Sequence, residues 1–254
     1  MPAVGVIEGA PPWRRLRTSL TTYVVQHPEA TFLVDPAYCR DARNKALKEH
    51  PWLVRKVATP PAATIATVDS LLATRFRPDF ALPTHAHWDH VCGLLDMPEL
   101  PVYLRGIEKD WVLGSERPPV GGVRTALTDG RSVVTYDLDG PPVASFAASH
   151  DLFGDSSVLL VDLPGHTPGS IGVLARTPSG WVLIAGDAAW HYEQIDRIRQ
   201  KPSFPGGLAQ VDFDRDAAFS TLHRLHLARH LMRLIPTHDH DASQHLSSSA
   251  EPPL

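Results

Sequence analysis

One run of six residues constrains this chain more than any other part of its sequence: His85-Ala86-His87-Trp88-Asp89-His90. It contains three histidines and one carboxylate. His85 and His87 are two positions apart, so an extended backbone would project their side chains to the same side. Asp89 and His90 follow where we expect the chain to turn, so they can face the same point from another direction. Imidazole and carboxylate groups clustered this closely indicate a metal site.

Composition narrows the class of protein. The chain has 254 residues, of which 43% are hydrophobic and 20% charged, enough for one large domain with a substantial core. We expect a single domain over residues 1–254, with a flexible tail at 247–254. The net charge of −4 and the absence of a run of Lys or Arg give no indication of a nucleic-acid-binding surface. A nucleic-acid partner is therefore not expected.

The same composition bears on location. Cys39 and Cys92 are the two cysteines, too few for a disulfide framework, and this favours a reducing compartment. No apolar run is long enough to span a membrane, and residues 1–17 lack the apolar core of a signal peptide. We therefore expect a cytoplasmic protein without a membrane partner.

Short strand-like runs and helical patterns alternate along the chain. Two strands around a turn are predicted within residues 18–35, and a hairpin within 171–185. Asp214 is the expected cap of a helix that reaches His230. Residues 80–82 are predicted as the strand that leads into the histidine cluster, 106–113 as a helix, and 190–211 as an irregular loop beside the site. The pattern predicts a mixed α/β fold.

Three more metal-capable residues follow strand-like runs. His166 comes after residues 158–161, Asp187 after 181–185, and His238 after 231–235. Alone, each is an ordinary surface or turn residue. Together with the six-residue cluster they form a specific set of seven ligand-type side chains.

In this combination the sequence resembles the metallo-β-lactamase superfamily. That family's signature is His-x-His-x-Asp-His, then Gly-His-Thr-x-Gly, then Gly-Asp, then a late His. The cluster matches the first motif, and the others are matched by Gly165-His166-Thr167-Pro168-Gly169, Gly186-Asp187 and Thr237-His238. The resemblance covers residues 21–240. It departs at Val91-Cys92-Gly93, where many relatives have Gly-Gly, and at Asp35-Pro36, where relatives often have Asp-x-Gly.

The resemblance implies a four-layer αββα sandwich with two divalent metal ions at one edge. One metal would be bound by His85, His87 and His166, the second by Asp89, His90 and His238, and Asp187 would bridge them. Ligands of this type suit Zn by default, with Mn, Fe or Co as alternatives. Cys92 is expected to be a small buried residue and not a ligand.

Within the superfamily the chain is most similar to the lactonase-type branch, which includes the N-acyl homoserine lactonases. This implies hydrolysis of an ester-like carbonyl, a lactone in the first place, by a metal-bridging hydroxide, with Asp89 carrying the proton. In that branch a Tyr three residues after the bridging Asp polarises the carbonyl. Here Trp190 has that position, and Tyr192, two residues later, is the candidate for the role. The alternatives are a thioesterase, a hydrolase of aryl or phosphate esters, and an iron-dependent redox enzyme such as a persulfide dioxygenase.

Overall fold

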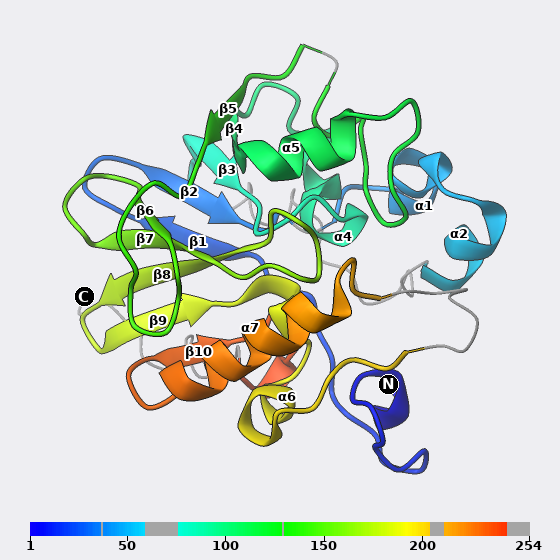
Figure 1. The fold of residues 1–254 in the computed structure, drawn as a ribbon. Helices are drawn as coiled ribbons and strands as arrows, with labels where there is room; N and C mark the ends of the chain where they lie inside the picture. The colour runs from blue at the N-terminus through cyan, green and yellow to red at the C-terminus, as the bar shows by residue number, and fades with distance from the viewer. Residues whose placement is uncertain (37, 59–75, 129, 204–210, 243–254) are drawn as a thin grey trace. The chain divides into compact units, whose positions relative to one another are not determined.

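The computed structural model describes residues 1–36, 38–58, 76–128, 130–203 and 211–242. The chain divides into two compact units: the first is Thr22–Asp137, and the second combines Met1–Thr21 with Leu138–Leu254. Each unit contains one five-stranded sheet (Figure 1). The expected tail at 247–254 lies outside the described residues, and the single domain expected over the whole chain stays a prediction.

The first unit is built on a sheet with the order β1-β2-β3-β4-β5. β1 and β2 form the predicted antiparallel pair, and the other neighbouring strands run parallel. The central strand β3 is completely buried, as expected for a strand that has neighbours on both sides. The bounds are Tyr23–Gln26 for β1, Thr31–Val34 for β2, Phe80–Leu82 for β3, Val102–Arg105 for β4 and Val133–Tyr136 for β5.

The helices of the first unit are short. α5 (Gly106–Leu113) is the predicted helix, and its Val112 joins a core with Ala81 and Leu104 of the neighbouring strands. Pro83 follows β3 directly, at the point where the backbone leaves the sheet, because proline cannot donate to the ladder. The other helical segments are α1 (Ala42–Lys45), η2 (Leu47–Glu49), α2 (Trp52–Ala58), α4 (Trp88–Val91) and η4 (Cys92–Asp96).

The second unit contains the sheet β10-β9-β8-β7-β6. β8 and β9 form the predicted hairpin, which closes with the pair Thr177 and Gly180, and β10 is added parallel to β9. The bounds are Ser149–Asp151 for β6, Val158–Asp162 for β7, Ile171–Thr177 for β8, Gly180–Ile184 for β9 and Arg233–Ile235 for β10.

α7 (Arg215–Ala228) is the main helix of this unit. Asp214 caps it as predicted, by accepting hydrogen bonds from the backbone N–H groups of Asp216 and Ala217. Leu222 and Leu225 pack with the sheet residue Leu183 in one apolar cluster. Short 3₁₀ turns occur at η1 (Ala3–Gly5) and η5 (Gly186–Ala188).

The segment predicted as an irregular loop, residues 190–211, contains a helix, α6 (Tyr192–Arg197). The His191 side chain accepts from the backbone N–H of Glu193, and the Gln194 side chain accepts from the backbone N–H of His191. This is a capping box. The expectation of a wholly irregular loop was wrong because histidine is not among the usual N-cap residues.

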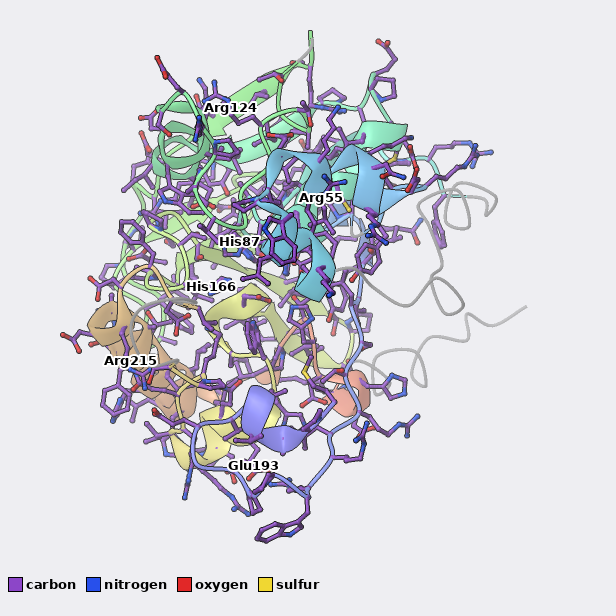
Figure 2. The ribbon with its side chains drawn as sticks, turned by 90° about the vertical axis from the view of Figure 1, so that its right-hand side faces the viewer. Arg55, His87, Arg124, His166, Glu193 and Arg215 are labelled. Carbon is purple, nitrogen blue, oxygen red and sulfur yellow. The ribbon has the colours of Figure 1, made fainter. Side chains whose placement is uncertain are left out.

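The first sixteen residues pack within the second unit. Ala3, Val6 and Ile7 belong to a small apolar cluster against which Trp190 packs. Arg14 makes a two-pronged ion pair with Glu193 of α6, and Glu8 pairs with Arg215 at 2.7 Å. Glu193 and Arg215 are labelled in Figure 2. The hydrogen bond to Arg14 lowers the pKa of Glu193.

Within the described part of the chain, no helix is both long enough and apolar enough to cross a membrane.

Candidate metal centre

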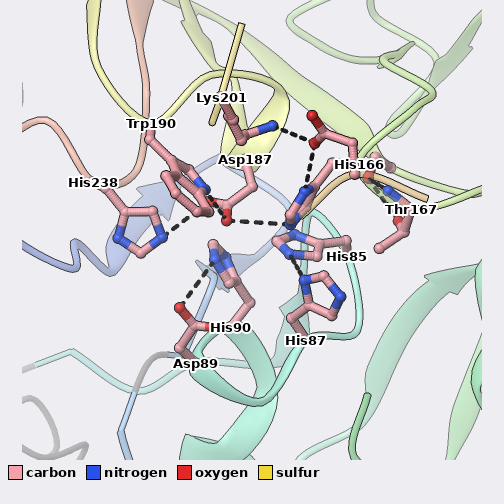
Figure 3. Close-up of polar contacts among 12 residues, drawn as sticks. His85, His87, Asp89, His90, His166, Thr167, Asp187, Trp190, Lys201 and His238 are labelled. Carbon is pink, nitrogen blue, oxygen red and sulfur yellow. Dashed lines mark hydrogen bonds and ion pairs between the residues drawn. The ribbon is translucent and has the colours of Figure 1, made fainter. Parts of the chain in front are cut away.

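The predicted histidine cluster lies between β3 and α4 in the first unit. His85 and His87 are on the connecting loop, and Asp89 and His90 are in the single turn of α4. His85 Nε2 lies 3.0 Å from His87 Nδ1 (Figure 3). Two imidazole nitrogens bound to one tetrahedral Zn at 2.0–2.1 Å would be roughly 3.3 Å apart. The two rings thus present their nitrogens at a spacing that one metal ion accepts, although the loop is not the extended strand expected from the sequence.

Asp35, at the end of β2, supports this loop from inside. Its Oδ1 accepts from the backbone N–H of Thr84 at 2.7 Å, and its Oδ2 accepts from the Thr84 hydroxyl at 3.0 Å. The hydroxyl oxygen lies 3.1 Å from His85 Nδ1. Because the Thr84 proton goes to Asp35, that oxygen accepts from His85 Nδ1–H. The lone pair of His85 is then on Nε2, the atom that faces His87.

α5 supports the same loop from another side. Its buried Glu108 accepts a hydrogen bond from the backbone N–H of Ala86 at 2.8 Å. Its Trp111 packs edge to face against the ring of His87, with 5.6 Å between the ring centres. Gly121 has a φ of +90°, and a Cβ there would lie 2.5 Å from His87 Cδ2. Only glycine fits at position 121 without moving the ring.

The other three predicted ligands come together in the second unit. Asp187 Oδ2 lies 3.3 Å from His166 Nε2, and Asp187 Oδ1 lies 3.1 Å from His238 Nε2 (Figure 3). Asp187 is in η5 directly after β9, while the two histidines follow β7 and β10. One carboxylate thus faces a histidine with each of its oxygens.

The remaining ring nitrogens show which way the protons point. His238 Nδ1 lies 3.1 Å from the carbonyl oxygen of Ser19, which can only accept. His166 Nδ1 lies 3.0 Å from Asp212 Oδ1, an ionised carboxylate that also only accepts. Both Nδ1 atoms are therefore donors, so in a neutral ring each Nε2 presents a lone pair to Asp187. Lone pairs facing a carboxylate need a cation between them, and a divalent metal ion satisfies this arrangement.

These observations agree with the comparison with known proteins. The sequence profile of the Metallo-beta-lactamase superfamily matches residues 17–238. The chain belongs to this superfamily.

The chain is similar in sequence to a probable metallo-hydrolase of Mycobacterium tuberculosis. It is 32% identical over 116 residues, which cover 44% of this chain and only 37% of that relative. The N-acyl homoserine lactonase AttM of Rhizobium radiobacter is 24% identical over 188 residues, covering 72% of this chain and 68% of AttM.

A solved N-acyl homoserine lactone hydrolase, with N-hexanoyl-L-homoserine bound at its catalytic metal centre, superposes with a TM-score of 0.68. The two sequences are 17% identical, and the superposition covers 96% of this chain and 91% of the solved hydrolase. The metallo-β-lactamase fold predicted from the motifs is confirmed, and so is the resemblance to lactonases at the level of the fold.

Two residues beside His166 were not found by sequence reasoning. Lys201 Nζ lies 2.7 Å from Asp212 Oδ1, and both side chains are almost fully buried in this superfamily member. Burial alone would raise the pKa of Asp212, but the ammonium of Lys201 and the hydrogen bond with His166 together hold that pKa well below its usual range. Neither Lys201 nor Asp212 belongs to a recognisable motif, so the sequence offered no signal for them.

The aromatic residues after Asp187 have separate surroundings. The indole Nε1–H of Trp190 donates to Asp187 Oδ2 at 2.7 Å (Figure 3). Tyr192 is the first residue of α6 and is 37% exposed. It lines a surface pocket of about 790 Å³ that also includes Arg197 and Arg233. The predicted catalytic role of Tyr192 stays a prediction, and Cys92 is buried as expected.

Proposed function

We propose that this protein is a metal-dependent hydrolase that opens a lactone or a related ester-like carbonyl. The observation that carries the proposal is Asp187, whose two oxygens face the Nε2 atoms of two histidines, His166 and His238. The ligand types suit two divalent ions, Zn by default with Mn, Fe or Co as alternatives. The proposed ligands are His85, His87 and His166 for one ion and Asp89, His90 and His238 for the other, with Asp187 between the ions.

When bound, such metal ions acidify a water molecule and polarise a carbonyl oxygen. The residues of the chain supply the orientation. Thr84 and Asp35 fix the ring of His85, and Ser19 fixes that of His238. Asp89, in the first turn of α4, is the proposed proton carrier to the leaving oxygen, and its Oδ2 lies 3.9 Å from His90 Nε2.

The lactone substrate is supported by AttM, which is named a lactonase, and by the fold shared with a lactone hydrolase. A lactone ring has no separate leaving group, because the alkoxide released stays on the product. Tyr192 is the proposed donor to the substrate carbonyl, since its phenol is at the exposed start of α6. A small-molecule substrate, a cytoplasmic location and a single domain complete the proposal.

The test is a substrate panel on protein loaded with Zn or Mn. We expect opening of acyl homoserine lactones, followed by release of one proton per ring opened, and loss of this activity in the chelator-treated protein. A matched panel of thioesters, aryl esters and phosphotriesters shows whether another class is preferred. Protein that binds two metals and opens no lactone, while it cleaves one of these esters, would contradict the substrate class and leave the hydrolase proposal intact.

The role of Tyr192 needs its own comparison. Tyr192→Phe removes the phenol oxygen alone, so we expect a loss of kcat on the lactone without a change in metal content. Tyr103→Phe, at a partly buried position of the first unit, is the matched control. Unchanged turnover in Tyr192→Phe would make Tyr192 a wall residue of its pocket.

A further inference from the structure

Lys201 is a cation in an unusual place. It follows α6 in the second unit, its side chain is 2% exposed, and the Asp212 carboxylate is 4% exposed. Burying two charges costs several kcal/mol per ion, so a buried pair of this kind is weak evidence for stability. The contacts of the pair point to another explanation.

The first contact leads to a proposed metal ligand. Asp212 Oδ1 lies 2.7 Å from Lys201 Nζ and 3.0 Å from His166 Nδ1. Figure 3 labels Lys201 and His166 and draws the two contacts as dashed lines. An ammonium group can only donate, and a carboxylate held by it can only accept. His166 must therefore donate from Nδ1, which leaves Nε2 for the metal. The tautomer of His166 is set by a partner that Lys201 holds in place.

The second contact leads to another ligand. Lys201 Nζ lies 5.7 Å from the centre of the Trp190 ring, within the range of a cation–π interaction. The indole of Trp190 donates to Asp187 Oδ2 at 2.7 Å. The Gln194 side chain accepts from the backbone N–H of Trp190 at 2.7 Å, so the main chain is held as well. The ammonium group of Lys201 thus lies over the ring of Trp190, the residue that orients Asp187.

We propose that Lys201 is a positioning residue of the metal centre: through Asp212 it fixes the tautomer of His166, and through the ring of Trp190 it holds the indole that orients Asp187. This inference rests on the proposed metal site and not on the identity of the substrate. It assigns to one buried side chain the orientation of two ligands that come from different strands.

Lys201→Met tests the proposal, because methionine keeps an unbranched apolar stem and removes the charge and the donors. Outer partners of metal ligands contribute about 10- to 100-fold to metal affinity, so we expect a loss of that size in chelator competition. Lys201→Arg should restore most of it, because arginine also donates to a carboxylate and stacks on aromatic rings. Lys45→Met, which breaks another Lys–Asp pair, with Asp96, is the matched control and should keep wild-type affinity.

A second measurement separates positioning from general loosening. Imidazole ¹⁵N spectra of the Zn-loaded protein should show a protonated Nδ1 on His166 in the wild type and in Lys201→Arg. In Lys201→Met this resonance should shift or broaden, while His238, which donates to Ser19, keeps its protonated Nδ1. Wild-type metal affinity together with an unchanged His166 resonance in Lys201→Met would overturn the proposal.

Two further variants decide the question if Lys201→Met does not fold. Asp212→Asn should shift the His166 resonance, and Trp190→Phe, which keeps a ring but loses the N–H donor, should weaken metal binding while His166 keeps its protonated Nδ1. If both variants bind metal like the wild type, the proposal fails. Wild-type protein that binds two metals but hydrolyses none of the substrate panel would contradict the proposed function and leave this test valid.

Discussion

His90 Nδ1 lies 2.9 Å from Oδ2 of Asp35, and both side chains are completely buried. Asp35 directly follows β2 and has a left-handed φ of 50°. The same carboxylate accepts from Thr84, whose hydroxyl in turn accepts from His85. One carboxylate therefore orients two proposed ligands of the first unit, one directly and one through a hydroxyl.

Asp35→Ala should weaken metal binding and stability together. It leaves the two buried donors of Thr84 without their acceptor, which costs roughly 1–3 kcal/mol for each group, and it removes the ion-pair partner of His90. Metal affinity should fall by about 10- to 100-fold. Thermal unfolding with and without chelator measures both effects. Asp41→Ala, at an exposed Asp with a similar φ of 54°, is the control, and an equal loss there would point to backbone strain alone.

Asp35 also shows what sequence reasoning left out. The cluster of His85, His87, Asp89 and His90 could be predicted because its ligands are contiguous and each has a metal-binding side chain. Asp35 contacts Thr84 across 49 positions, and Asp212 contacts His166 across 46. No local pattern indicates pairings over such separations. The signals available for Asp35 were its place directly after an apolar strand and the Asp-x-Gly that relatives often have there, and neither indicates its partners.

The same holds for the helices and strands: those set by neighbouring residues could be predicted, and the others could not. The β8–β9 hairpin and the cap of α7 could be predicted, since their turn and cap residues are adjacent in sequence. α6 was missed because its capping residue is His191, whose ring nitrogen takes the place of the usual hydroxyl or carboxylate. The position of Trp190 depends on packing with the segment around Val6, which composition does not reveal.

Metal analysis of the purified protein should give close to two equivalents. His85→Ala should remove a ligand of one ion and His238→Ala a ligand of the other, so each variant should retain about one equivalent. Each should also lose the metal-dependent part of its thermal stability, because the ions bind the folded state. His150→Ala, at a surface pair with Asp139, should keep both equivalents. A fully active enzyme with a single equivalent would contradict the two-metal site.

Asp89→Asn should separate metal binding from proton transfer. The amide keeps the shape and one oxygen ligand, so much of the metal should remain, but it cannot carry a proton at neutral pH. We expect turnover to fall by about 10²-fold or more, the typical contribution of general acid–base catalysis. Steady-state kinetics on protein of known metal content is the measurement. Near-normal turnover in the metal-replete variant would leave Asp89 as a ligand only.

Gly165→Ala should displace His166. Gly165 has a φ of +126°, and a Cβ there would lie 2.2 Å from the backbone nitrogen of Ala218 in α7. Overpacking costs typically about 1–3 kcal/mol, and left-handed strain adds about 1–2 kcal/mol. Gly154→Ala, at a φ of +76° with open space around it, carries the strain alone and is the control. Chemical unfolding should show the larger loss at Gly165, together with weakened metal binding only there.

His50 should make the free energy of unfolding depend on pH below about 6.5. Its ring is buried beside η2 in the first unit, and this burial lowers its pKa, against a smaller opposite effect of Glu49. The unfolded chain takes up a proton near pH 6.5, while the folded chain does so only at lower pH. The unfolded state therefore binds more protons as the pH falls below 6.5, so the stability that neutral His50 allows is present above that pH and is lost below it.

The measurement is the free energy of unfolding of wild type and His50→Leu at each pH. One proton gives a slope of at most about 1.4 kcal/mol per pH unit, so the difference between the two proteins should change by less than this and only below about pH 6.5. Taking the difference cancels the titration of the proposed metal ligands, which both proteins share. His230→Leu, at an exposed position after α7, is the matched control and should follow the wild type. A difference that stays constant from pH 8 to 5 would show that the folded His50 takes up its proton as readily as the unfolded chain.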